Sequence, residues 1–146
     1  MNETKRNRLS GIVLDASIEV HRNLGPGLLE SVYESCLYSE LTDRKIACKR
    51  QVDFPIHYKD KRLDEKLVID ILVEDEIIIE LKAVERILPI HEAQLLTYLR
   101  LSNKRLGLLI NFNMPTLTEG FKRLINGFDE SLRLCVSVVP IICARN

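Results

Sequence analysis

The feature that most constrains the fold is a strongly apolar stretch, residues 67–82, in which charged side chains fall at a few regular positions. Alternation predicts two strands whose odd-numbered residues form one dry face; these are Ile69, Ile71, Val73, Ile77, Ile79 and Leu81. The opposite face carries Asp70, Glu80 and Lys82 among apolar residues. The stretch therefore predicts a hairpin that is dry on one face and partly charged on the other.

The length of the hairpin loop decides whether the three charges share a face. Residues paired across an antiparallel hairpin lie on the same face, and a slip of one residue moves every side chain to the other face. A two-residue turn at Glu74 and Asp75 would pair Asp70 with Ile79. A three-residue loop, 74–76, pairs Asp70 with Glu80 instead and keeps both faces consistent. We therefore predict an odd-length loop of three residues.

Two interpretations of these charges stay open on the residues alone. Lys82 can form an ion pair with Asp70 or Glu80 at the margin of the sheet. Two carboxylates and one lysine nevertheless leave a surplus negative charge, which is costly to bury unless a cation offsets it. A hard ion such as Mg²⁺ prefers carboxylate, carbonyl and water oxygens. The hairpin therefore indicates either an ion pair or a divalent-metal site.

The rest of the chain predicts a mixed sheet flanked by helices, an α/β sandwich. We expect helices at about 8–23, 28–44, 90–101 and 115–127, and strands at about 46–58, 67–73, 77–83 and 105–112. In the second helix we expect Val32, Cys36 and Leu37 to be buried. Residues 132–143 are apolar enough for an extra strand, but their pattern does not place it.

Length and composition predict a single globular domain over residues 1–146, with 46% hydrophobic and 29% charged residues. The formal net charge is zero, so no global field attracts polyanions. Any nucleic-acid binding must use a local patch and should weaken with salt. Residues 44–66 supply one, with eight basic and four acidic residues, although an ordinary solvated surface explains the same excess.

The cysteines and the N-terminus indicate a cytoplasmic protein without a membrane segment. The four cysteines are Cys36, Cys48, Cys135 and Cys143. They form no CxxC pair, no zinc-site spacing and no closely spaced iron–sulfur set, so we expect reduced thiols. The first residues are polar, unlike a signal peptide, and residues 132–143 are too few to span a bilayer.

Two motifs in combination resemble one known family. Asp70, followed by Glu80-Leu81-Lys82, resembles the D…(D/E)xK signature of the PD-(D/E)XK phosphodiesterase superfamily, although Ile69 stands where its name has proline. The run from Gly27 to Tyr33 matches the motif of the GxxExxY family, a branch of that superfamily. The resemblance covers about 8–127 and leaves the tail, 128–146, unassigned. It implies a restriction-endonuclease-like three-layer sandwich with a central mixed β-sheet.

The same resemblance extends to two further elements of the site. Gln94-x-x-x-Tyr98 is similar to the QxxxY element of the RecB-type exonuclease branch, and Glu30 corresponds to the acidic residue which that branch carries on the helix before its sheet. His91, Gln94 and Tyr98 lie on one helical stripe. This stripe can face the metal site or form an ordinary, partly buried polar seam. His21 and His91 are further possible metal ligands, although a lone histidine is more often structural.

The resemblance implies a nuclease that hydrolyses phosphodiester bonds with Mg²⁺ or Mn²⁺. Asp70, Glu80 and the Leu81 carbonyl would hold the metal, with Glu30 contributing directly or through water. Lys82 would orient the attacking water and counter charge on the phosphorane. Gln94 and Tyr98 would orient the substrate. DNA is the expected substrate, although the sequence does not itself distinguish DNA from RNA.

Two alternatives to an active nuclease remain. The chain can be a catalytically silent nucleic-acid-binding or protein-interaction module that kept the fold, although retention of Asp70, Glu80 and Lys82 together argues against a decayed site. It can also be an interaction subunit whose hairpin charges form only an ion-pair network. A chain of 146 residues has little surface for gripping a duplex, so a homodimer or a larger partner is expected.

Overall fold

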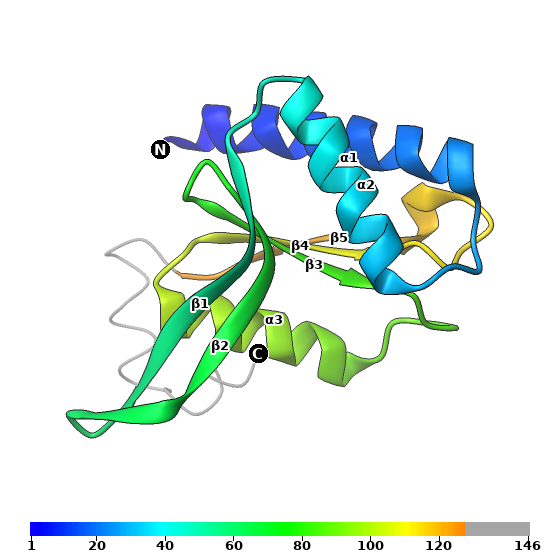
Figure 1. Ribbon diagram of the computed structural model, residues 1–146. Helices are drawn as coiled ribbons and strands as arrows, with labels where there is room; N and C mark the ends of the chain where they lie inside the picture. Colours follow the sequence, from blue (N-terminus) through cyan, green and yellow to red (C-terminus); the bar gives the residue numbers. More distant parts are fainter. Residues whose placement is uncertain (128–146) are drawn as a thin grey trace.

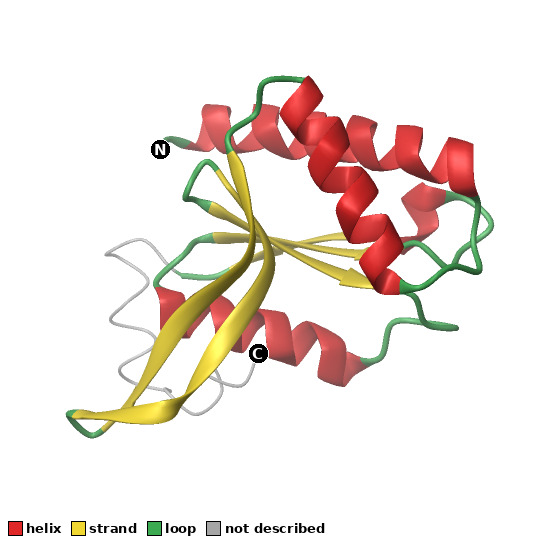
Figure 2. Ribbon diagram, viewed as in Figure 1, coloured by secondary structure: helices red, strands yellow, loops and turns green. Residues whose placement is uncertain are grey.

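The computed structural model describes residues 1–127, which form a five-stranded sheet with helices on both faces (Figures 1 and 2). The elements in chain order are α1 Glu3–Leu24, α2 Glu30–Asp43, β1 Cys48–Tyr58, β2 Lys61–Val73, β3 Ile77–Lys82, α3 Pro89–Ser102, β4 Leu106–Asn111, a short 3₁₀ helix Leu117–Gly120 and β5 Phe121–Ile125. The strand order is β1-β2-β3-β4-β5. Among these five strands, only β3 and β4 pair in parallel. This mixed, helix-flanked sheet confirms the predicted fold class.

Each face of the sheet has its own apolar core. Helices α1 and α2 cover one face, and α3 covers the other (Figure 1). Strand β4 is buried along its whole length between the two, as its unbroken apolar run predicts. On the α3 side, Gly107 lets the helix approach β4 closely, because a Cβ there would come within 3.0 Å of three Leu95 side-chain atoms.

The hairpin between β2 and β3 has the predicted three-residue loop. Val73 pairs with Ile77 and Ile71 with Ile79, which leaves 74–76 as the loop. The left-handed backbone of Glu74 and Asp75 makes this tight turn. The odd-numbered residues from Ile71 onwards pack under α1 and α2, so the register is confirmed, and the dry face is confirmed for all of its predicted residues except Ile69.

Ile69 departs from that face. It is fully buried, but it packs with Leu72 and Ile78 on the α3 side. The pairing of β1 with β2 skips Gln51 and Asp70, and Gln51 has a left-handed backbone with φ of 50°. A local distortion of this kind increases strand twist and interrupts the alternation of side chains.

The last predicted helix, 115–127, is wrong. Thr116 and Glu119 form a capping box, but it begins only the 3₁₀ helix, and the chain continues as β5, antiparallel to β4. At Gly120 the chain packs directly on the backbone of Asn111, where a Cβ would lie 2.1 Å from the carbonyl oxygen. This contact directs the chain back along β4, whose buried backbone groups need a partner on that edge.

The expectations for burial in α2 are partly right and partly wrong. In α2, Leu37 is buried and Cys36 half-buried, but Val32 is 37% exposed. The thiols of Cys36 and Cys48 are free. Cys135, Cys143 and the extra strand considered at 132–143 lie outside the described residues. Within 1–127, no helix is both long and apolar enough to cross a membrane.

Candidate active site

The candidate site lies at a fork where β2 and β3 separate. Their paired residues end at Ile71 and Ile79, and Figure 1 shows β2 turning away from β3 beyond this point. Two carboxylates replace the missing backbone partners. The Leu81 N–H donates to Asp70 Oδ2 at 2.9 Å, and the Asp70 N–H donates to Glu80 Oε1 at 3.4 Å. We call this arrangement of Asp70 and Glu80 the fork.

When both of its carboxylates are ionised, the fork holds more negative charge than its surroundings neutralise. Glu80 is only 6% exposed, and burial, followed by repulsion from Asp70, raises its pKa to about 8 despite the Asp70 N–H and Lys82. Burial also raises the pKa of Asp70; the Leu81 N–H and Lys82 oppose this shift, while Glu34 and Glu30 add to it. Within the described chain, Lys82 forms no ion pair with either carboxylate. A closed ion-pair network therefore does not describe the site.

Lys82 is instead connected to α3. Its Nζ donates to Gln94 Oε1 at 3.4 Å, and Gln94 Nε2 donates to Tyr98 Oη at 3.3 Å. Burial raises the pKa of Tyr98, and the charge of Glu80 raises it further. The predicted stripe of Gln94 and Tyr98 therefore faces the fork and is coupled to it through Lys82.

Glu30 reaches the site from the first turn of α2. Its carboxylate is exposed and acts on Asp70 and Glu80 through charge, with no direct contact to either in the described structure. Tyr33 shapes the loop before it: its hydroxyl donates to the Gly25 carbonyl at 2.6 Å and accepts from the Leu28 N–H at 3.1 Å.

The Tyr33 ring also stacks on Phe112, with centroids 4.6 Å apart. The loop that Tyr33 holds contains Gly27, whose φ of 102° favours glycine. The Gly27, Glu30 and Tyr33 motif therefore describes one local unit: a glycine turn, a carboxylate at the helix start and a tyrosine that fixes both.

A clamp that the sequence pattern did not predict joins α2 to β1. The buried Glu34 carboxylate accepts from Arg50 Nε at 3.0 Å and from Gln51 Nε2 at 2.7 Å. Arg50 also donates to Ser35 Oγ and lies 5.6 Å above the Tyr38 ring. The clamp holds β1 at Gln51, the position beside Asp70 that the β1–β2 pairing omits. The spacing of Glu30 and Glu34, four residues on one helix, was the available signal.

Neither histidine is brought to the fork by any contact within residues 1–127. His21 Nε2 donates to the Met114 carbonyl at 2.8 Å, which joins α1 to the segment before the 3₁₀ helix. His91 Nδ1 accepts from the Leu88 N–H at 2.9 Å and caps α3. These contacts favour the structural interpretation of both residues over metal ligation.

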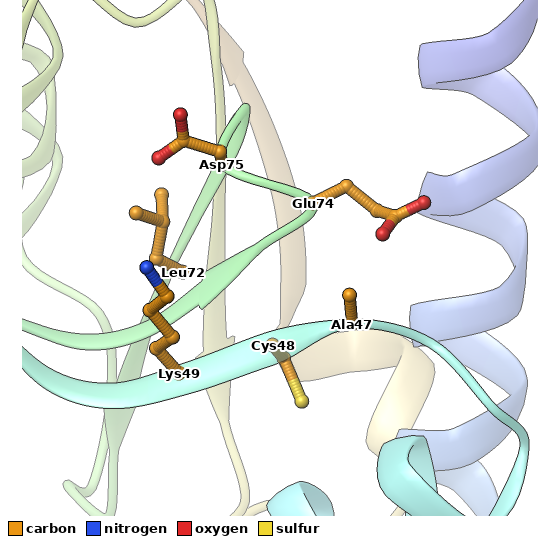
Figure 3. A pocket seen from close by; sticks show the side chains of 6 residues that line it. All are labelled: Ala47, Cys48, Lys49, Leu72, Glu74 and Asp75. Carbon is orange, nitrogen blue, oxygen red and sulfur yellow. The ribbon is translucent and has the colours of Figure 1, made fainter.

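A pocket beside the β2–β3 loop is distinct from the fork (Figure 3). Its lining residues are Ala47, Cys48, Lys49, Leu72, Glu74 and Asp75. Burial raises the pKa of the Cys48 thiol, a Thr42 hydrogen bond opposes this shift, and Glu74 adds to it. A thiol held neutral in this way is a poor nucleophile, so the pocket offers no evident chemistry.

The fork fits a divalent ion of the magnesium type. Strand alternation turns the Leu81 carbonyl toward the side that β2 has left, because the next carbonyl, of Lys82, accepts from the N–H of Phe112, the residue after β4, at 2.9 Å. Asp70, Glu80 and this carbonyl supply three hard oxygen donors. No cluster of three or more His, Cys, Asp or Glu side chains suited to a metal occurs within 1–127, so water would complete the coordination.

Comparison with known proteins shows which family and which solved structure this chain resembles. Residues 7–124 match the family model described as the PD-(D/E)XK nuclease superfamily. The crystal structure of SSO0001 is similar, with a TM-score of 0.48 and 21% identity over 77% of this chain. The match spans 58% of that longer chain. Among curated proteins there is no significant match. The narrower GxxExxY assignment stays a prediction.

The fork predicts that stability falls as the pH rises. Because folding raises the pKa of Glu80 from 4.5 to about 8, its stabilising contribution is present below pH 4.5 and is lost as the pH rises through 8. In chelator-treated protein, Glu80→Gln should melt several degrees above wild type at pH 8.5 and equally at pH 4.5, at about 2–4 °C per kcal/mol. Exposed Glu65→Gln should show no such trend. A constant offset across the pH range would contradict the prediction.

The Tyr33 hydroxyl is predicted to order the loop that precedes Glu30. Tyr33→Phe removes both hydrogen bonds and keeps the stack on Phe112, so the free energy of unfolding should fall by about 1–2 kcal/mol. Hydrogen exchange of the Leu28 amide should accelerate in the same variant. Tyr38→Phe is the matched control, because Tyr38 contacts Arg50 through its ring. Unchanged exchange at Leu28 would show that the hydroxyl does not hold the loop.

Proposed function

Since this chain belongs to the PD-(D/E)XK nuclease superfamily, we propose that it is a metal-dependent phosphodiesterase that hydrolyses nucleic acid. The observation that carries the proposal is the fork: two adjacent carboxylates, both with raised pKa values, beside a lysine that does not neutralise them. PD-(D/E)XK nucleases typically use Mg²⁺ or Mn²⁺. A divalent ion is also the group that offsets such a surplus of negative charge.

Asp70, Glu80 and the Leu81 carbonyl would hold the ion, and Glu30 would act through a water molecule because it makes no direct contact with the fork in the described part of the chain. When bound, a divalent ion neutralises charge on the phosphate and makes a coordinated water more acidic. The clamp of Glu34 on Arg50 and Gln51 would keep Asp70 in place while the ion binds.

Lys82 would orient the attacking water and counter the charge that develops on the phosphorane. An ammonium has three donors and no acceptor, so we assign it electrostatic positioning rather than general-base action. Its hydrogen bond to Gln94 restricts where the ammonium can point. Gln94 and Tyr98 would thus position Lys82 and contact a phosphate or base of the substrate.

Metal binding at the fork is tested with Asp70→Asn, which keeps an oxygen acceptor for the Leu81 N–H. Titration calorimetry with Mn²⁺ should show one site in wild type and at least about tenfold weaker binding in the variant, because one anionic ligand becomes neutral. Exposed Asp64→Asn on the same strand is the matched control. Absence of binding to wild type, or equal binding to all three proteins, would refute the metal site.

Catalysis is tested with Lys82→Met, which keeps the length of the side chain and removes its charge. Single-stranded, duplex and branched oligonucleotides are incubated with Mg²⁺ or Mn²⁺. Wild type should cut at least one of them, and the variant should be slower by about 10²-fold or more. Lys5→Met, an exposed lysine on α1, should cut like wild type. If wild type binds metal but cuts nothing, the chain is a silent module that retained the fold.

A further inference from the structure

The outer half of the β1–β2 ribbon projects beyond the sheet. Figures 1 and 2 show it extending past α3, away from every helix. We call residues 55–66 the arm; all of them except Ile56 are exposed. Strand β2 pairs with β3 only at residues 71–73, so within residues 1–127 the two strands of the arm pair only with each other. An isolated two-stranded hairpin is marginally stable at best in water, and core packing therefore does not account for the projection.

The tip of the arm is a tight and well-defined turn. Lys59 and Asp60 both have left-handed backbones, with φ of 47° and 66°, and Tyr58 pairs with Lys61 across them. This is the geometry of a two-residue hairpin turn, whose twist matches that of the strands. The tip is therefore a narrow ribbon end rather than a loose loop.

Positive charge is concentrated at this tip. Lys59, Lys61 and Arg62 stand against a single acid, Asp60, and within the described residues none of the three forms an ion pair. Closer to the sheet, positive and negative charges balance. Lys66 forms an ion pair with Asp53 at 2.8 Å, and the acidic residues 64 and 65 lie in the irregular segment of β2.

An aromatic ring accompanies these cations. Tyr58 is 59% exposed, and Lys59 Nζ lies 5.4 Å from its ring centroid. Unpaired cations beside an exposed aromatic ring are suited to a polyanion that also offers apolar surface, as a nucleic-acid groove does. An acidic protein would offer the charge without the regular groove.

We propose that the arm lies in the major groove of B-form DNA next to the segment held at the fork, an inference that rests on the proposed nuclease function. The major groove of B-DNA is about 12 Å wide and admits a two-stranded ribbon. The major groove of A-form RNA is too narrow and deep for side chains to read. The arm therefore selects duplex DNA over duplex RNA.

The strand itself sets the spacing between arm and fork. Arg62 and Asp70 lie on the same strand, β2, eight positions apart in the sequence. At about 3.3 Å per residue, the tip is on the order of 25 Å from the fork. That distance corresponds to roughly seven base pairs of DNA. A duplex that extends less than this from the fork cannot reach the tip.

The binding test compares two triple variants in a Lys82→Met background, so that the nucleic acid stays intact. The arm variant carries Lys59→Gln, Lys61→Gln and Arg62→Gln. The matched control carries Lys5→Gln, Arg8→Gln and Arg22→Gln, all exposed on α1. Fluorescence anisotropy with Mn²⁺ measures the affinity for a DNA duplex of about 20 base pairs, for the RNA duplex of the same sequence and for the single DNA strand. Each affinity is measured over a range of salt concentrations.

For duplex DNA, the arm variant should bind at least about tenfold more weakly than its parent, with a salt slope smaller by up to about three, since three phosphate contacts are lost. The α1 control, and the arm variant on RNA or single strands, should stay within about twofold of the parent. Equal losses on all nucleic acids would show a non-specific charge effect and overturn the proposal. Unchanged DNA binding would overturn it as well and leave the arm to a protein partner.

Duplex length separates failure of the arm from failure of the proposed function. With Lys82 restored, the arm variant should cut a long duplex more slowly than wild type but cut equally well a hairpin-closed duplex of about five base pairs, which is too short to reach the tip. If wild type cuts DNA and the arm variant matches it on both lengths, the arm proposal fails and the nuclease stands. If neither cuts but the arm variant loses DNA binding, the nuclease fails and the arm stands.

Discussion

The exchange of backbone for side-chain partners at the fork determines most of this structure. Two N–H groups, of Asp70 and Leu81, leave the β2–β3 ladder and bond to carboxylates instead. Because their partners are now side chains, β2 can turn away and run with β1, while β3 continues along β4. The same exchange leaves Glu80 buried and Asp70 half-buried, and this burial favours the protonated form of each carboxyl group. Sheet architecture and site electrostatics thus have one origin.

The opposite side of β2 depends on the clamp from α2. A left-handed Gln51 is unfavourable by itself, of order 1 kcal/mol, and it persists because Glu34 binds both Gln51 and its neighbour Arg50. The interrupted pairing beside Asp70 lets Ile69 turn to the α3 side. Helix α2 therefore acts on the fork twice, through the clamp on the backbone and through the charges of Glu30 and Glu34 on the carboxylates.

The residues that sequence reasoning placed correctly are those governed by local periodicity. Parity placed Asp70 and Glu80 together, and helical spacing aligned Gln94 with Tyr98. The errors arise where a distant contact overrides a local pattern. A helix was expected at about 115–127, but close packing of Gly120 on Asn111 redirects the chain into β5. The Glu34–Arg50 clamp joins separate elements, so the spacing of Glu30 and Glu34 on α2 does not identify the partner on β1. One domain over the whole chain stays a prediction.

A chain without net charge can still handle a polyanion if its charges are segregated, and here they are. When its carboxylates are ionised, the fork repels phosphate together with the α2 carboxylates, whereas the tip of the arm attracts it. On the order of 25 Å separates the two, more than two Debye lengths of about 10 Å at 0.1 M salt. The cations of the tip therefore cannot cancel the repulsion at the fork. Only a cation bound at the fork itself can do that, so metal and arm should contribute to DNA affinity independently, one at each end of β2.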